Sequence, residues 1–208
     1  MDERPEPCSR PTVKLDLGCG QKKVRGSIGV DIMAGPAVDM LADFRYGLPF
    51  RDNSVDTIHA YHLLEHMEDF LGFMDEIWRV CRPGALVYIK IPNAASLFDT
   101  WKDPTHKRGL YIATFTYFDD NYFDGNAFSY YAKARFRIEK ARLNFFQYRW
   151  GLHRRILGHL VHVAANRTRT SQYLCERYWG HLLGIEEAAI ILRAVKKDVP
   201  AAEAALAP

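Results

Sequence analysis

A short apolar run that leads straight into two glycines constrains this chain more than any other feature. Residues 13–17 read VKLDL and are followed by Gly18, Cys19 and Gly20, and a second β-rich run, 27–32, ends in an aspartate. Glycine lacks a Cβ, so the backbone can bend sharply there and a ligand can lie against it. Ligands of open parallel sheets bind at the carboxyl ends of the strands. The stretch therefore predicts a binding site after the first strand.

Five further runs rich in β-forming residues are bounded by Gly, Pro or Asp-Asn-Ser clusters, which is typical of strands. They are residues 38–43, 55–61, 85–92, 135–146 and 187–196. Apolar residues recur at helical spacing between Leu64 and Cys81, and Arg82-Pro83-Gly84 ends that pattern. A strand, a helix and a returning strand form a right-handed crossover. The sequence predicts an α/β, doubly wound (Rossmann-like), mostly parallel seven-stranded sheet, with 135–146 and 187–196 as edge strands and one of them antiparallel.

A chain of 208 residues that is 48% hydrophobic can bury one sizeable core. We expect a single domain over residues 12–196, preceded by a disordered leader (1–11) and followed by a flexible tail (197–208). Helical and aromatic insertions at about 94–131 and 148–181 are predicted to form lid segments over the site.

Several features favour a cytoplasmic protein. The apolar runs are shorter than the roughly 20 residues of a membrane-spanning helix, and the acidic, proline-containing N-terminus lacks the pattern of a secretory signal. The four cysteines form no CxxC pair. We therefore expect neither disulfides nor a structural zinc, and no metal site.

The charge is unevenly distributed along the chain. Residues 135–181 hold ten Arg or Lys and two Glu, a charge of +8, so the remainder carries −5 of the total of +3. Such a segment can attract an anionic substrate, lipid headgroups or nucleic acid. A plain solvated basic face explains the same pattern, and the sequence leaves these alternatives open.

The second strand ends in Asp31, whose carboxylate can accept hydrogen bonds from both hydroxyls of a ribose. A dinucleotide site would carry a third glycine at the start of a helix to hold the pyrophosphate, but that position is Lys23 here. The turn therefore favours a nucleoside ligand without a pyrophosphate.

Five motifs now stand in a recognisable order over about residues 13–93. They are LDLGCG, GVDI, LADF followed by LPFRDNSVD, HLLEH, and RVCRPGALVYIKIPN. In this order and spacing they resemble the class I S-adenosylmethionine-dependent methyltransferases of the methyltransferase type 11 kind. The resemblance implies a methyltransferase that uses S-adenosyl-L-methionine as cofactor.

The resemblance also implies roles for individual residues. It places Asp16, Gly18, Cys19 and Gly20 around the methionine end of the cofactor, Asp31 and Ile32 at the ribose, Asp43 and Phe44 beside the adenine, and Tyr61 and His62 along the methyl-transfer cleft. Plainer roles compete: a tight turn for the glycines, a cap for either aspartate, and packing for the cysteine. The chain departs from the family pattern at Gln21, where a third glycine is usual, and in a loop too short for a helix before the second strand.

The stretch HLLEH (62–66) also reads as the H-x-x-E-H signature of a zinc protease. That chemistry needs both histidines on one face of a regular helix. Because His62 follows the strand directly and Glu65 and His66 are expected in the first turn of the helix, this alternative is disfavoured.

Methyl transfer to a hydroxyl is assisted by a base, and WKDPTHKR (101–108) offers one directly after the fifth strand. His106 is suited to neutral pH, Asp103 is predicted to orient it, and His62 is the second candidate. A turn with an exposed histidine is the alternative. The stretch 111–131 holds nine Tyr or Phe, which predicts either a lid over the substrate or a core or dimer patch.

We expect a small-molecule acceptor of anionic or aromatic character, with oxygen favoured over nitrogen as the methylated atom. A nucleic-acid substrate is disfavoured for two reasons. AYHL replaces the [DNS]-P-P-[YF] motif of DNA methyltransferases that act on exocyclic amines. Methylation of pyrimidine C5 needs a cysteine nucleophile, and Cys81 lies at a helix end, which is not a plausible place for one. Contact with a membrane surface stays open, as does the choice between monomer and homodimer. Two alternatives remain: an RNA methyltransferase that uses residues 135–181, and a catalytically silent methyltransferase-like partner subunit.

Overall fold

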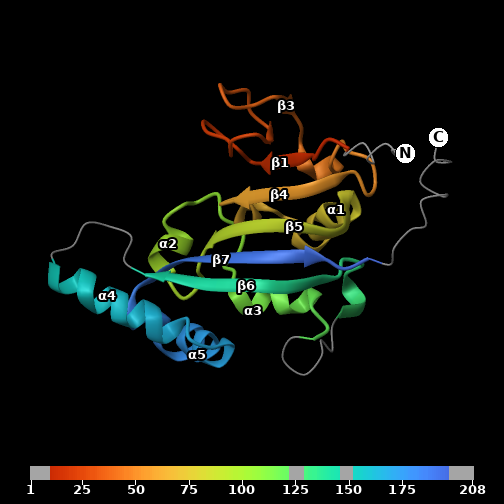
Figure 1. Ribbon diagram of the computed structural model, residues 1–208. Helices are drawn as coiled ribbons and strands as arrows, with labels where there is room; N and C mark the ends of the chain where they lie inside the picture. Colours follow the sequence, from red (N-terminus) through yellow and green to blue (C-terminus); the bar gives the residue numbers. More distant parts are fainter. Residues whose placement is uncertain (1–9, 122–128, 146–151, 197–208) are drawn as a thin grey trace, which may run out of the picture.

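One seven-stranded sheet organises the chain (Figure 1). The computed structural model describes residues 10–121, 129–145 and 152–196. The strands are β1 (Lys14–Leu17), β2 (Ile28–Asp31), β3 (Met40–Leu41), β4 (Val55–Tyr61), β5 (Cys81–Pro92), β6 (Phe136–Phe145) and β7 (Ile185–Ala194). Their order across the sheet is β3-β2-β1-β4-β5-β7-β6. Each predicted strand is present, and the predicted α/β fold class is confirmed.

The sheet is parallel from β3 to β5, and β7 pairs antiparallel with both of its neighbours. β6 is an edge strand, as expected from its loose alternation. β7 differs from the prediction in its place, because it lies between β5 and β6. Ile190 of β7 pairs with Ile89 of β5 on one side and with Ala141 of β6 on the other. Neighbouring strands therefore flank both edges of β7, a position that suits its apolar residues.

The helices are short, apart from two. They are α1 (Phe70–Val80), α2 (Leu97–Trp101), α3 (Ile112–Phe115), α4 (Leu152–Ala165), α5 (Arg169–Leu174) and α6 (Gly180–Leu183), with 3-10 turns η1 (Phe44–Tyr46), η2 (Leu64–His66), η3 (Thr116–Phe118) and η4 (Ser129–Tyr131), and a π-helical turn η5 (Cys175–Trp179). The predicted helix after β4 begins later than expected. Asp69 caps α1 by accepting a hydrogen bond from the Gly72 amide. Glu65 and His66 therefore lie in the separate turn η2, and their prediction as the first turn of the helix was wrong.

The core lies between one face of the sheet and α1. Phe70 and Met74 on α1 are buried against strand residues such as Ile89. Part of the aromatic stretch 111–131 joins this core, because Phe115 and Phe118 are fully buried and both pack against Phe70. The start of that stretch is thus core packing. Residues 122–128 lie outside the described residues, and the lid prediction stays a prediction for them.

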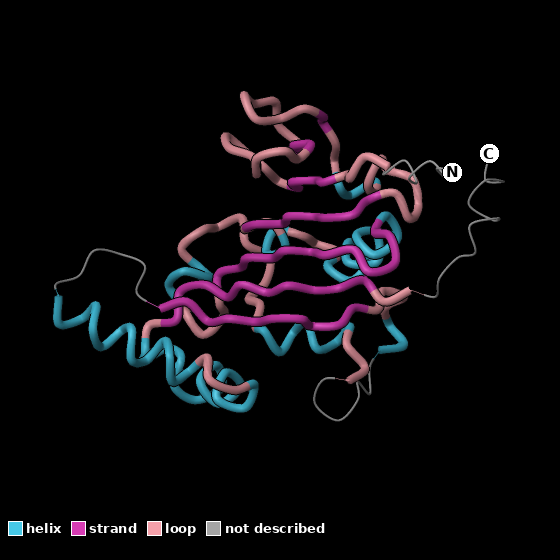
Figure 2. The backbone as a smooth tube through the Cα atoms, in the orientation of Figure 1, coloured by secondary structure: helices cyan, strands magenta, loops and turns pink. Residues whose placement is uncertain are grey.

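The connections between β1, β2 and β3 are short. Residues 18–27 and 32–39, which join β1, β2 and β3, contain turns and bends but no helix (Figure 2). The glycine turn is therefore not continued into a helix, as the short interval predicted. β2 consequently ends near the surface, where Ile32 is 59% exposed, whereas Leu17 at the end of β1 is fully buried.

The basic segment packs along the edge strand. Asn166, next to the end of α4, exchanges hydrogen bonds with both the amide and the carbonyl of Leu143 on β6, and Gln172 on α5 donates to the Ala141 carbonyl. These contacts satisfy backbone groups of an otherwise unpaired edge. Among the described residues, no helix combines the length and the apolar character needed to cross a bilayer.

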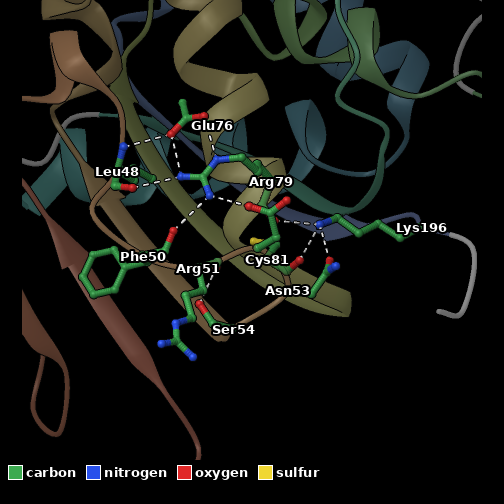
Figure 3. A network of polar contacts seen from close by, with 10 residues as sticks. Leu48, Phe50, Arg51, Asn53, Ser54, Glu76, Arg79, Cys81 and Lys196 are labelled. Atoms are coloured by element: carbon green, nitrogen blue, oxygen red, sulfur yellow. Dashed lines mark hydrogen bonds and ion pairs between the residues drawn. The ribbon is translucent and has the colours of Figure 1, made fainter. Parts of the chain in front are cut away.

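Arg79, near the end of α1, fastens the loop before β4 (Figure 3). Its guanidinium donates to both carboxylate oxygens of Glu76 at 2.8 Å and to the carbonyl oxygens of Leu48 and Phe50 at 2.9 Å. Glu76 in turn accepts from the Leu48 amide. Lys196, beyond β7, donates to the carbonyl oxygens of Arg79 and Cys81. A planar fork with five donors suits this cluster of acceptors better than any other side chain.

We predict that Arg79→Ala lowers the free energy of unfolding by about 2 kcal/mol, because it leaves two carbonyl groups and the carboxylates of Glu76 and Asp52 without their charged donor. Urea denaturation measures the effect. Arg51→Ala is the matched control, since Arg51 is exposed and its guanidinium points away from the network (Figure 3); it should change stability by less than about 0.5 kcal/mol. Equal losses in both variants would contradict a structural role for the network.

Candidate active site

A cleft opens at the carboxyl ends of β1, β2 and β4, where the sequence predicted a site. Its volume is about 360 Å³, within the range of small-molecule sites. We call it the glycine cleft. It is lined by Gly18, Asp31, Ile32, Asp43, Phe44, Arg45, His62, Leu63, His66, Met67 and Glu68.

Gly18 provides the bare backbone at the base of this cleft. Its φ of +67° lies in the left-handed region, and its amide donates to the Val30 carbonyl at 2.8 Å. A Cβ built at this position would lie 2.9 Å from Cδ1 of Leu63. Both the conformation and the close approach therefore require glycine.

Asp31 is held at the edge of the glycine cleft by its neighbours in sequence and space. Its Oδ2 accepts from the Gly20 amide at 2.9 Å, and its Oδ1 accepts from the Met33 amide at 3.0 Å. Each carboxylate oxygen keeps a further lone pair for a ligand. Ile32 follows it with 59% of its surface exposed, so an apolar side chain stands beside the carboxylate.

Asp43 and Phe44 form the opposite wall. Asp43 caps η1 and pairs with Arg45 through both carboxylate oxygens, with distances down to 2.6 Å. The hydrogen bonds from Arg45 lower the pKa of Asp43. Phe44 stacks on Phe73 with ring centroids 5.4 Å apart. A carboxylate beside a fixed aromatic ring can bind an amine attached to a flat ring system.

Four residues of the predicted cofactor set do not line the glycine cleft. Asp16 is buried and accepts from the Val24 amide at 2.6 Å, and burial raises its pKa. Cys19 donates its thiol to the Ala37 carbonyl. Gly20 reaches the cleft only through its bond to Asp31. Tyr61 lies on the other side of β4, its hydroxyl 3.0 Å from Nδ1 of His59.

A second cavity, the histidine pocket, adjoins the first. It has a volume of about 270 Å³ and is lined by His62, Glu65, His66, Pro92, Asp99, Lys102, Asp103, His106, Glu186 and Glu187. His62 and His66 line both cavities. The three predicted catalytic residues are therefore together in a space that shares a wall with the glycine cleft.

His62 stands at the junction. Its φ of +52° turns the chain sharply after β4, and its imidazole lies between two carboxylates, with Nε2 3.1 Å from Glu187 and Nδ1 3.6 Å from Glu65. The hydrogen bond to Glu187 and the nearby carboxylate of Glu65 raise the pKa of His62 to about 9. Burial favours the protonated form of Glu187, but its bonds with His62 and Asn144 lower its pKa to about 2. At neutral pH His62 is therefore a cation that donates a hydrogen bond to Glu187.

His106 is oriented by a backbone carbonyl. Its imidazole is almost fully buried, and Nδ1 lies 2.5 Å from the carbonyl oxygen of Thr100. Asp103 stands farther away, with Oδ2 3.8 Å from Nε2 of His106. Its Oδ1 accepts from the amide and the hydroxyl of Thr105, which lowers the pKa of Asp103. Thr100 thus orients His106, the task that the sequence assigned to Asp103.

The loop that carries His106 is anchored by a buried carboxylate that the sequence analysis did not single out. Glu176 accepts from the Asn93 side chain at 2.6 Å and from the Ile112 amide at 2.8 Å. Its burial raises its pKa. Glu65, His66 and Thr105 were also not predicted as site residues. The motifs HLLEH and DPTH carry them, but their juxtaposition depends on how two distant segments fold together.

Comparisons with known proteins agree with this geometry. Residues 29–89 match the family model of the methyltransferase domain. A probable S-adenosylmethionine-dependent methyltransferase from Mycolicibacterium smegmatis is 31% identical over 122 residues, which are 49% of this chain and 48% of that protein. The chain therefore spans about half the length of this curated relative.

Solved structures share the fold. An S-adenosylmethionine-dependent methyltransferase from Archaeoglobus fulgidus superposes with a TM-score of 0.53 and 19% identity, over 88% of this chain and 86% of that one. The [4+2]-cyclase SpnF superposes with a TM-score of 0.51 and 17% identity, over 89% and 76% of the two chains. At such identities the likeness concerns the fold alone, and the fold does not by itself fix the reaction.

The match of residues 29–89 to the methyltransferase domain and the similarity to the curated relative support a class I S-adenosylmethionine-dependent methyltransferase, as the sequence motifs predicted. The sheet order agrees with that fold. The same similarities support S-adenosyl-L-methionine as the cofactor.

We predict that Asp31→Ala weakens binding of S-adenosylhomocysteine by about tenfold or more, because a hydrogen bond to a charged group contributes about 1.5 to 3 kcal/mol. Isothermal titration calorimetry measures the affinity. Asp39→Ala is the control: Asp39 also accepts from a backbone amide, that of Gly29, but it does not line the cleft. An unchanged affinity in Asp31→Ala, or an equal loss in both variants, would remove Asp31 from the ribose site.

Proposed function

We propose that this protein transfers a methyl group from S-adenosyl-L-methionine to a hydroxyl group of a small molecule held in the histidine pocket. The observation that carries the proposal is the shared wall of the two cavities. His62 and His66 belong to both. Methyl transfer requires the acceptor atom and the methyl donor to be aligned at close range, and two adjoining cavities provide room for both partners.

The residues of the glycine cleft fit this cofactor. The bare backbone at Gly18 admits the methionine end, and Asp16, Cys19 and Gly20 shape the turn around it. Asp31 would accept hydrogen bonds from the ribose, and Ile32 and Phe44 would cover the adenine, with Asp43 beside its amine. His62 stands at the junction of the two cavities, whereas Tyr61 lines neither of them. The cofactor, when bound, supplies an activated methyl group on a sulfonium.

The charge of the histidine pocket bears on the acceptor. Five carboxylates line it, from Glu65, Asp99, Asp103, Glu186 and Glu187, and Lys102 pairs with Asp99 at 2.6 Å. An anionic acceptor would be repelled there, so we favour a neutral molecule with several hydroxyl groups, such as a sugar, over the anionic acceptor considered from sequence. His106 assists loss of the hydroxyl proton, because its Nδ1 is bonded to the Thr100 carbonyl and its Nε2 is left to act.

Transfer of a labelled methyl group from S-adenosyl-L-methionine to a panel of neutral sugars, phenols, sugar phosphates and RNA tests the function. We expect methylation of neutral hydroxyl compounds, with formation of S-adenosylhomocysteine. Methylation of RNA alone would favour the RNA alternative. A protein that neither binds S-adenosylhomocysteine nor methylates any member of the panel would be the silent partner subunit, and the proposal would be wrong.

We predict that His106→Ala lowers turnover by about 100-fold or more, the usual contribution of a group that assists proton transfer. Its affinity for S-adenosylhomocysteine should stay within about twofold of wild type, because His106 does not line the glycine cleft. Steady-state kinetics and calorimetry measure the two effects. His181→Ala, at an exposed histidine on α6, should leave both unchanged, and a full-rate His106→Ala enzyme would exclude His106 from catalysis.

A further inference from the structure

Three side chains in the histidine pocket offer ligand atoms that converge on one point. One nitrogen or oxygen atom from each of Glu65, His66 and His106 lies within 4.8 Å of the other two. We propose that these residues bind a divalent transition-metal cation, which the sequence analysis did not expect. The binding itself does not depend on the proposed function, but the role given to the cation below does.

Glu65 is the first reason for a cation. Only 2% of its surface is exposed, and neither of its carboxylate oxygens accepts a hydrogen bond among the described residues. His62 forms an ion pair with it, but Nδ1 of His62 stays 3.6 Å from Oε1, which is longer than a hydrogen bond, so both oxygens still lack a donor. A buried carboxylate without hydrogen bonds is costly and rare. A directly bound cation would offset that cost.

The hydrogen bond of His106 prepares it as a ligand. A carbonyl oxygen can only accept, so Nδ1 of His106 must carry the proton that it shares with Thr100. In the neutral ring Nε2 then holds a free lone pair. Histidine ligands of metals commonly donate their second nitrogen to a backbone carbonyl in this way.

The same argument applies to His66 through a chain of two bonds. The hydroxyl of Thr105 lies 2.6 Å from Oδ1 of Asp103 and 3.0 Å from Nδ1 of His66. An ionised carboxylate only accepts, so the single hydroxyl proton goes to Asp103. His66 must then donate from Nδ1 to Thr105, and its Nε2 lone pair is also free. Two separate networks thus leave the same nitrogen available on both rings.

The resulting ligand set is two imidazoles and one carboxylate. This set is typical of catalytic Zn²⁺ sites and of other divalent first-row metals, and it leaves coordination positions open. Bond lengths of about 2.1 Å would bring the ligand atoms to about 3 to 3.5 Å from one another, so a small side-chain rotation would close the site. The carboxylate of Asp103 also lines the pocket and adds a negative field that favours a cation, whereas those of Asp99 and Glu187 are paired with Lys102 and His62.

A cation in this position would face the acceptor. The histidine pocket is the cavity assigned to the acceptor, and a hydroxyl group bound at an open coordination position has a lowered pKa. His106 would then assist deprotonation as a ligand of the cation. The acceptor proton would pass to water, and its oxygen would become a stronger nucleophile toward the methyl group.

Titration of EDTA-treated protein with MnCl₂ and, separately, with ZnCl₂ tests the proposal, by calorimetry and, for Mn²⁺, by electron paramagnetic resonance. Neither cofactor nor acceptor is present, so the result does not depend on methyl transfer. We expect one ion per chain. Glu65→Gln should weaken binding by about tenfold or more, whereas Glu139→Gln, at an exposed glutamate on β6 that lines neither cavity, should not.

Because Glu65 is buried and its variant could fail to fold, Thr105 gives a second test. Thr105→Val removes the hydroxyl that orients His66 and should weaken metal binding by about tenfold, the usual effect of losing such a partner. Thr105→Ser keeps the hydroxyl and should bind as wild type does. Absence of binding at millimolar metal, or equal affinity in wild type, Glu65→Gln and Thr105→Val, would overturn the proposal. Binding of S-adenosylhomocysteine by the EDTA-treated protein would show that such a failure concerns the metal site and leaves the proposed function standing.

Discussion

The contact between His62 and Glu187 holds the two cavities in one place. The His62 amide donates to the Lys90 carbonyl at 2.8 Å, and the imidazole pairs with Glu187 on β7, so the turn after β4 is fixed to both following strands of the sheet. The imidazolium then separates the glycine cleft from the histidine pocket while lining both. Without this fixed turn, the ends of β4 and β7 would not present a common wall, and the glycine cleft and the histidine pocket would lose their alignment.

Local patterns predicted most of the fold and one half of the site. The strands were found because each is a short apolar or β-branched run between turn residues, a signal contained in neighbouring residues. Asp31 lines the glycine cleft because a strand end in a parallel sheet places its last side chain at the ligand edge, and its role at the ribose stays a prediction. The alternation of side chains along a strand explains why Tyr61, which was also predicted to line the cleft, does not do so. It shares a face with His59 and faces away from the cleft, because Ala60 between them is buried in the core.

Features that depend on distant segments could not be predicted in this way. Helical spacing continues from Leu64 into α1, so periodicity alone did not separate the turn η2 from the helix; the cap at Asp69 does. The inner position of β7 results from pairing with β5, whose residues lie 95 to 107 positions earlier in the chain. Glu65, His66 and His106 meet only because the loop after β5 folds back against the turn after β4, which the backbone bond from the Lys107 amide to the Glu65 carbonyl secures.

That fold-back depends in turn on Glu176. A carboxylate buried in the interior is costly unless hydrogen bonds satisfy it, and here the donors are Asn93 at the start of the loop and the Ile112 amide at its end. Both ends of the segment that carries His106 are therefore tied to one oxygen on the helical segment that follows β6. The basic region, whose role the sequence left open, thus has a structural role. Its Glu176 fixes the side of the histidine pocket, while the parallel strand ends fix the side of the glycine cleft.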